Sequence, residues 1–216
     1  MTPELGHFLL WLALGCAFVL GTVPLAGAVK VRADWMAVAR PLAFWQFVLI
    51  FGAYVCLTTS FIQHDFSVEY VATHSNSALP FWYRVAAVWG GHEGSMLLWL
   101  LMQSGWTLAV ALFSRSLPLP MLARVLAVMG WLSVGFVLFT LVTSNPFDRL
   151  IPAAADGRDL NPLLQDPGLI FHPPMLYMGY VGFSVAFAFA VAALLAGKLD
   201  ATWARWTRPW TSAAWI

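Results

Sequence analysis

The chain has 216 residues, of which 61% are hydrophobic and only 10% are charged, and its formal net charge is +1. This composition excludes a soluble globular or disordered chain and predicts an integral membrane protein without a soluble domain. The near-neutral charge gives no reason to expect binding to nucleic acid.

The apolar residues form uncharged blocks, and a block of about 20 residues is enough to cross a bilayer. Five complete transmembrane helices are expected, at residues 5–29, 41–62, 94–113, 125–143 and 173–197. A sixth is expected to start near Pro209, and too few residues follow it for a crossing. The predicted fold is therefore an all-α polytopic membrane protein, and we expect residues 1–216 to be a fragment, a split subunit or a truncated gene product.

The basic residues predict how the spans are oriented. Alternate connections hold Lys30, Arg32, Arg40, Arg115, Arg124, Lys198, Arg205 and Arg208, and the other connections hold only Arg84, Arg149 and Arg158. Basic residues favour the cytoplasmic side of a membrane. We therefore expect the N-terminus and His172 to lie on the outer side.

The first outer segment, residues 63–91, is too polar to lie in lipid. Its end is rich in aromatic residues, including Trp82, Tyr83 and Trp89. Aromatic side chains favour the membrane–water boundary, so we expect a helix lying along the surface here.

The third span is preceded by the run Trp89-Gly-Gly-His92-Glu93-Gly-Ser95. Its glycines remove side-chain bulk, so a partner backbone or the plane of a ligand can come close. Trp89, His92 and Glu93 are therefore candidate cofactor-binding residues. The alternative is that His92 and Glu93 lie in headgroup water and only begin the helix, since ionisable groups inside a bilayer are costly.

The second outer segment, after Thr143, leads to His172-Pro173-Pro174. Proline suits the first turn of a helix and keeps the preceding residue extended, so we expect Pro173 and Pro174 to open the fifth span with His172 at its mouth. An imidazole there, beside apolar residues and Tyr177, suits an axial ligand of haem iron. The alternative is a histidine that only completes the helix start. No catalytic residue is identified.

Five runs resemble the N-terminal third of the CcmF/NrfE family of cytochrome c-type biogenesis proteins. They are His64-Asp-Phe-Ser-Val-Glu-Tyr-Val71, Trp89-Gly-Gly-His-Glu-Gly-Ser-Met-Leu-Leu-Trp99, Asn145-Pro-Phe-Asp-Arg-Leu150, Asp156-Gly-Arg-Asp-Leu-Asn-Pro-Leu-Leu-Gln-Asp-Pro-Gly168 and Phe171-His-Pro-Pro-Met-Leu-Tyr-Met-Gly-Tyr-Val-Gly-Phe183.

The resemblance implies a multi-pass haem lyase (holocytochrome c synthase) subunit of the bacterial inner membrane, acting in System I cytochrome c maturation. Members receive haem from the chaperone CcmE at the periplasmic face. With a CcmH-type thiol protein they support haem attachment to apocytochrome c. His172 matches the first of two periplasmic histidines that serve as axial ligands.

The family's second periplasmic histidine, its tryptophan-rich segment and two transmembrane histidines would lie beyond Ile216. The chain alone is therefore expected to be inactive, and a separate chain could supply the remaining helices. An alternative function is a non-catalytic membrane scaffold, or a remnant, that docks assembly partners and binds no haem.

Overall fold

The computed structural model describes residues 1–197 and 199–216, so Lys198, one of the basic residues expected inside, lies outside it. In the described chain every regular element is helical. In order they are α1 (Thr2–Lys30), α2 (Ala33–Ala37), α3 (Ala39–Ile62), α4 (Glu69–His74), α5 (Phe81–Ala86), η1 (Ala87–Trp89), α6 (His92–Phe113), α7 (Leu119–Thr143), η2 (Pro162–Leu164), α8 (Pro167–Ala196) and α9 (Ala201–Trp215). Five helical segments, in α1, α2–α3, α6, α7 and α8, are long and apolar enough to cross a membrane, which confirms the predicted fold class.

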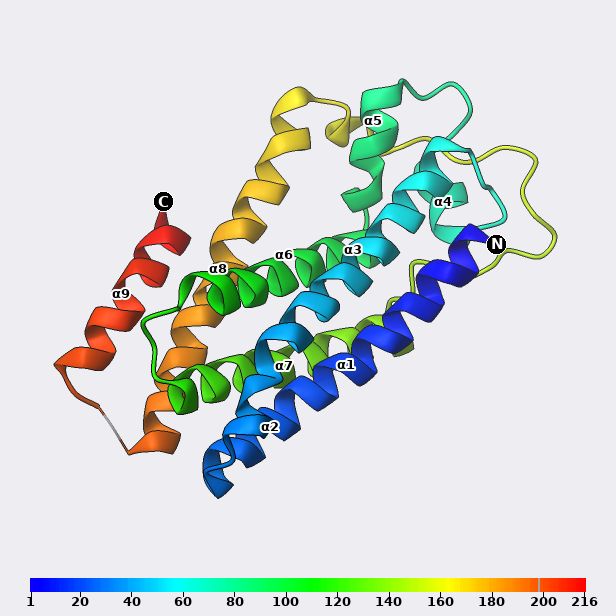
Figure 1. Ribbon diagram of the computed structural model, residues 1–216. Coiled ribbons are helices and arrows are strands. Elements are labelled where there is room, and N and C mark those ends of the chain that lie inside the picture. The colour runs from blue at the N-terminus through cyan, green and yellow to red at the C-terminus, as the bar shows by residue number, and fades with distance from the viewer. Residues whose placement is uncertain (198) are drawn as a thin grey trace.

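The long helices lie side by side, and two long connections gather at the end of the bundle that holds the N-terminus (Figure 1). We call this end, formed by residues 63–91 and 144–166, the loop end. The start of α8, which includes His172, lies there too, so the N-terminus and the first turns of α8 share one end of the bundle, as the topology prediction requires. That this end faces the periplasm stays a prediction.

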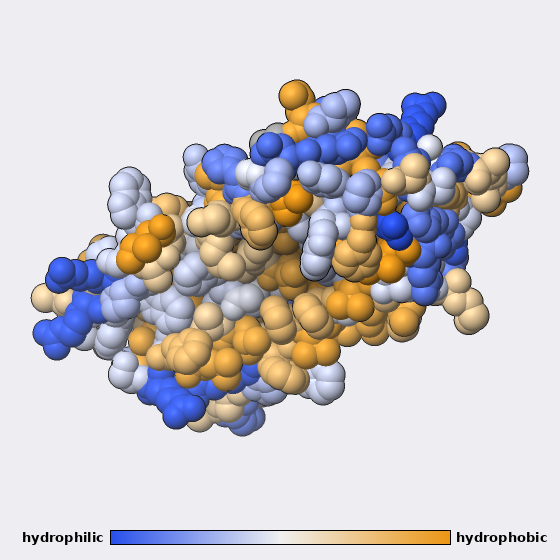
Figure 2. Space-filling view, turned by 90° about the horizontal axis from the view of Figure 1, so that it is seen from above, coloured by the Kyte–Doolittle hydropathy of each residue, from blue (hydrophilic) through white to orange (hydrophobic). Residues whose placement is uncertain are grey.

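Small residues let the helix backbones come close. Close van der Waals packing of this kind holds helices together in a membrane, because lipid is as apolar as the helices and gives no hydrophobic driving force between them. At the α1–α7 contact, a Cβ added to Gly130 would lie 2.7 Å from the backbone nitrogen of Gly21. On the face seen in Figure 2, hydrophobic residues cover much of the middle and the most hydrophilic ones lie toward the edges, as a membrane-spanning bundle needs.

The expectation that Pro173 and Pro174 open the fifth span is wrong. The helix α8 begins at Pro167, where the Asp166 side chain caps it by accepting the Gly168 N–H at 2.8 Å. Both later prolines lie inside α8, so His172 is helical and not extended. An acidic cap followed by proline is a complete start signal. A membrane helix also tolerates interior proline, because neighbouring groups can satisfy the freed carbonyls.

The helix after the fifth span also begins earlier than expected. Asp200 caps α9 by accepting the N–H groups of Thr202 and Trp203, both at 3.0 Å, and Pro209 lies inside this helix. The side chain of Trp203 then donates to the Phe189 carbonyl at 3.1 Å. This contact fastens α9 against α8.

The aromatic residues of the first outer segment form the short helices α5 and η1. Phe81 and Trp82 are exposed there. Their expected position along the membrane surface stays a prediction.

Candidate functional site

His172 lies in the second turn of α8 with an exposed imidazole. It lines a groove of ≈ 550 Å³ together with Met175, Tyr180 and Phe183 of α8 and Trp215 of α9. The α8 residues share a face because they recur at about helical spacing. The structure therefore sets this imidazole at the edge of an apolar surface.

The other α8 residues singled out in the sequence lie differently. Pro173 and Pro174 are half-buried beside His172. Tyr177 is not in the lining of the groove, because its ring packs edge-on against Trp99 of α6, with 5.6 Å between centroids. Tyr177 thus contributes to the α6–α8 contact.

The glycines before α6 let a protein side chain approach closely. The Tyr70 hydroxyl accepts the Gly91 N–H at 2.9 Å and donates to the Val88 carbonyl at 3.1 Å. A Cβ on Gly94 would lie 1.7 Å from that carbonyl oxygen and 2.6 Å from the Tyr70 hydroxyl. In the described chain the groups that come close to Gly94 are the Val88 carbonyl and the Tyr70 side chain of α4.

Tyr70 is only 4% exposed, and its burial raises the pKa of its hydroxyl above the ordinary value. The His74 ring packs on it with 4.5 Å between centroids. Tyr70 therefore stays protonated and can keep its bond to the Val88 carbonyl.

The remaining candidates sit at the start of α6. Trp89 and Glu93 are half-buried, and the Trp89 carbonyl accepts the Ser95 hydroxyl at 2.9 Å. His92 is exposed, and its Nδ1 lies 3.1 Å from the Ser144 hydroxyl at the end of α7.

His92 lines a different groove, of ≈ 570 Å³, with Met96 of α6 and Trp131, Phe136 and Phe139 of α7. The predicted site residues thus fall into two groups. His172 lines the groove between α8 and α9, and His92 lines the one between α6 and α7.

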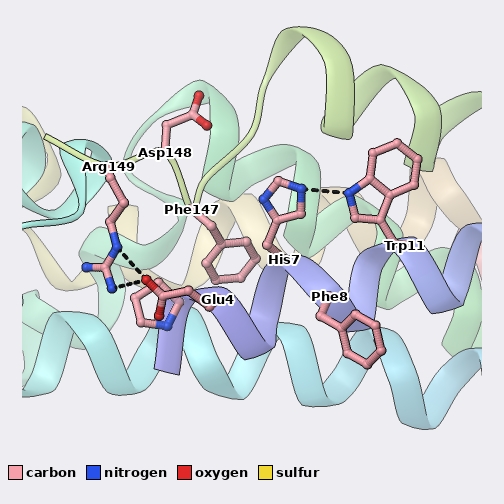
Figure 3. A pocket seen from close by; sticks show the side chains of 8 residues that line it. Glu4, His7, Phe8, Trp11, Phe147, Asp148 and Arg149 are labelled. Carbon is pink, nitrogen blue, oxygen red and sulfur yellow. Dashed lines mark hydrogen bonds and ion pairs between the residues drawn. The ribbon is translucent and has the colours of Figure 1, made fainter. Parts of the chain in front are cut away.

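A third groove, of ≈ 460 Å³, contains His7 of α1 (Figure 3). Both ring nitrogens of His7 have neighbours in the described chain. Nε2 accepts the Trp11 indole N–H at 2.7 Å, and Nδ1 lies 3.4 Å from Asn145 Nδ2.

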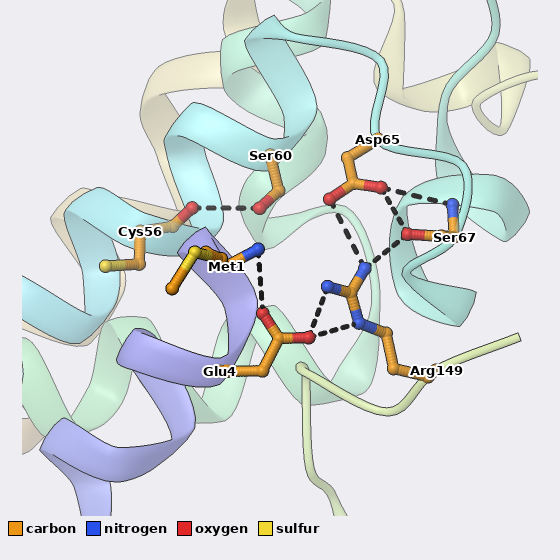
Figure 4. A network of polar contacts seen from close by, with 7 residues as sticks. All are labelled: Met1, Glu4, Cys56, Ser60, Asp65, Ser67 and Arg149. Carbon is orange, nitrogen blue, oxygen red and sulfur yellow. Dashed lines mark hydrogen bonds and ion pairs between the residues drawn. The ribbon is translucent and has the colours of Figure 1, made fainter.

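Arg149 joins the loops of the loop end (Figure 4). Its guanidinium donates to Glu4 Oε1 at 2.8 Å and reaches Asp65 at 3.4 Å, and it also donates to the Ser67 hydroxyl. The Glu4 carboxylate raises the pKa of Arg149 above its ordinary value. A backbone bond from Leu150 N–H to the Ser67 carbonyl, at 2.8 Å, strengthens the same junction.

The next part of the loop lies against residues 72–77. The Ser77 hydroxyl donates to Asp156 at 2.7 Å, and the Arg158 N–H donates to the Ala72 carbonyl at 2.7 Å. Hydrogen bonds from Ser77 hold the pKa of the Asp156 carboxyl below its ordinary value. A Cβ on Gly90 would lie 2.9 Å from buried Leu160, so the loop also covers the turn before α6.

Among the residues that the structure describes, no group of three or more His, Cys, Asp or Glu side chains could hold a metal ion.

Residues 89–216 match the family model described as cytochrome C assembly protein. This stretch is more than half of the chain and includes every site residue expected from the sequence. The chain belongs to this family. The resemblance seen in the motifs is thereby confirmed.

Relatives of the family match over the full length of the chain. It is 64% identical to the cytochrome c-type biogenesis protein CcmF of Pseudomonas aeruginosa and 62% identical to that of Escherichia coli, covering 33% and 34% of them. It is 48% identical to the cytochrome c-type biogenesis protein NrfE of Haemophilus influenzae, covering 34% of it.

A solved structure, named cytochrome c haem lyase CcmF, matches with a TM-score of 0.85 and 28% identity. The match covers 100% of this chain and 34% of that one. The chain thus spans about a third of the length of the relatives it matches.

Proposed function

We propose that the chain is the N-terminal part of a haem-handling protein of cytochrome c maturation, and that His172 is an axial ligand of haem iron. The observation that carries this proposal is the exposed His172 imidazole at the edge of the apolar groove between α8 and α9. None of the hydrogen bonds among the described residues uses its ring, so either ring nitrogen is free to bind.

The groove suits the group that the family implies. Imidazole is a usual axial ligand of haem, and Met175, Tyr180 and Phe183 offer a wall for the apolar faces of the porphyrin. When bound, haem supplies the vinyl groups to which cysteine thiols of an apocytochrome are joined. The residues of this chain bind and orient it.

The setting proposed for this role is the bacterial inner membrane, with the loop end and His172 in the periplasm. The proposed partners are the haem chaperone CcmE, a CcmH-type thiol protein, apocytochrome c and a separate chain that carries further helices.

The test replaces His172 by alanine in the complete assembly. Haem capture from the chaperone and cytochrome maturation should both fall sharply, because the iron loses its ligand. His7→Ala is the matched control, since both nitrogens of that ring have neighbours at the same end of the bundle. If His172→Ala leaves capture and maturation at the original level, the ligand role is wrong. If the partners co-purify while haem absorbance is absent even in the original chain, the scaffold function is correct.

A further inference from the structure

The second groove, between α6 and α7, presents an imidazole in a similar setting. His92 lies on its rim, and its volume of ≈ 570 Å³ is close to the ≈ 550 Å³ of the His172 groove. Trp131 and Phe139, each 44% exposed, form much of its wall. An apolar pocket with a polar group at its rim is a common form of ligand site.

His92 is held in place by its neighbours while one nitrogen stays free. Its Nδ1 lies 3.1 Å from the Ser144 hydroxyl, and its ring packs edge-on against Phe139 at 6.1 Å. No hydrogen bond within the described chain uses Nε2 of His92. A metal at Nε2 requires the ring proton on Nδ1, where the Ser144 oxygen could accept it. This arrangement, a ligand imidazole oriented through its other nitrogen, is usual for metal-binding histidines.

The other histidines of the loop end lack this combination. Both nitrogens of His7 have neighbours, although His7 also lines a groove with aromatic residues (Figure 3). His74 packs on Tyr70, and its Nε2 lies where a Cβ on Gly91 would come within 2.3 Å. The Nδ1 of His64 is buried.

The floor of the His92 groove is open at Gly135. A Cβ added there would meet nothing within 4 Å, so no side chain of the described residues occupies this position. A flat ligand can therefore lie against α7 without displacing protein atoms.

We infer that the α6–α7 groove is a second, separate binding site for an iron porphyrin, with His92 Nε2 as the iron ligand and Ser144 as its positioning residue. The inference takes its ligand from the proposed function. It places the second porphyrin in a groove that is separate from the one lined by His172.

The experiment titrates ferric protoporphyrin IX into the chain in lipid nanodiscs and counts imidazole-bound iron by Soret absorbance and resonance Raman spectroscopy. The double variant His92→Ala/His172→Ala defines background partition into lipid. The original chain should bind two equivalents above this background. His172→Ala and His92→Ala should each retain one.

The outcomes separate the two proposals. If His172→Ala abolishes all specific binding, or His92→Ala changes nothing, the second site does not exist and the His172 ligand stands. If His92→Ala abolishes binding and His172→Ala does not reduce it, the second site stands and the His172 ligand fails.

Two further variants test the groove and the positioning residue. Gly135→Leu should remove the His92 equivalent by filling the groove. Gly15→Leu is the matched control, because a Cβ at Gly15 also meets nothing within 4 Å and Gly15 lies on α1 outside this groove. Ser144→Ala should weaken only the His92 equivalent, by about 10- to 100-fold, as loss of a partner that orients a metal ligand does. Binding unchanged in Gly135→Leu would overturn the site, and unchanged affinity in Ser144→Ala would overturn the role of Ser144.

Discussion

Replacing Tyr70 by phenylalanine should loosen the turn that places His92. The change keeps the ring, which packs edge-on against Phe61 at 5.5 Å, and removes only the hydroxyl. The hydroxyl's main hydrogen bonds are lost, the one from the Gly91 N–H and the one to the Val88 carbonyl, together with a longer contact to the Ala87 carbonyl at 3.5 Å.

The magnitude follows from the burial of these two groups. Val88 is fully buried, so its carbonyl loses a partner where water does not reach it, whereas Gly91 is only partly buried. A buried polar group left without a partner costs about 1 to 3 kcal/mol, and an ordinary net hydrogen bond contributes about 1 kcal/mol. We expect a loss of about 2 kcal/mol in the free energy of unfolding. For a chain of this size that lowers Tm by about 4 to 8 °C.

The assay is thermal unfolding of the chain in nanodiscs, together with hydrogen exchange at the Gly91 amide, which should become faster. Tyr83→Phe is the matched control, because the Tyr83 hydroxyl makes no hydrogen bond to another described residue. Unchanged Tm and unchanged Gly91 exchange in Tyr70→Phe would refute the reasoning.

The pH dependence has a definite sign. Because burial raises the pKa of Tyr70 in the folded chain, the stabilisation is complete below the ordinary tyrosine pKa of about 10. It is lost as the pH rises through the higher folded value. Tyr70→Phe should abolish this part of the alkaline loss, which thermal scans at rising pH would detect.

Three further predictions concern other parts of the bundle. Gly94→Ala should lower the free energy of unfolding by about 3 kcal/mol or more, because its Cβ would overlap the Val88 carbonyl. Gly135→Ala is the control, and thermal unfolding should show no loss of stability there, because a Cβ at Gly135 meets open space. Gln46→Leu should raise Tm, because Gln46 is 0% exposed and neither amide atom has a partner among the described residues; a fall in Tm would contradict this. The Ser77–Asp156 contact should persist from pH 7 to pH 5, since the pKa of Asp156 is lowered, and weaken only below the ordinary value of about 3.9. Limited proteolysis of the loop, measured from pH 7 to below the ordinary Asp pKa, would check this prediction. In Asp156→Asn the increase in cleavage at low pH should be absent.

The spans could be predicted because hydropathy and length decide them in a bilayer. The five apolar blocks all appear as helices, with bounds that start a few residues earlier than expected. The start of α8 was predicted wrongly because the sequence contains two possible helix starts. Asp166-Pro167 and Pro173-Pro174 both suit a first turn, and only the earlier one also has a side-chain cap. Giving weight to that cap would have found the start.

The site was only partly predictable, because tertiary contacts between distant residues decide it. Nothing in the local pattern places Tyr70 beneath Gly91, or brings Arg149 to Glu4 near the other end of the sequence. The glycines correctly indicated a close approach, but they could not say what approaches. The division of His92 and His172 between two grooves depends on which helix faces they occupy once packed.

The two adjacent prolines within α8 have a mechanical consequence. Pro173 and Pro174 have no N–H, so the preceding turn lacks two of the backbone hydrogen bonds that stiffen the rest of the helix. The N-terminal part of α8 is therefore less stiff than the rest of the helix, and His172 lies in it. A displacement of residues 144–166, which lead into α8, would therefore swing the imidazole while the rest of α8 stays packed in the bundle.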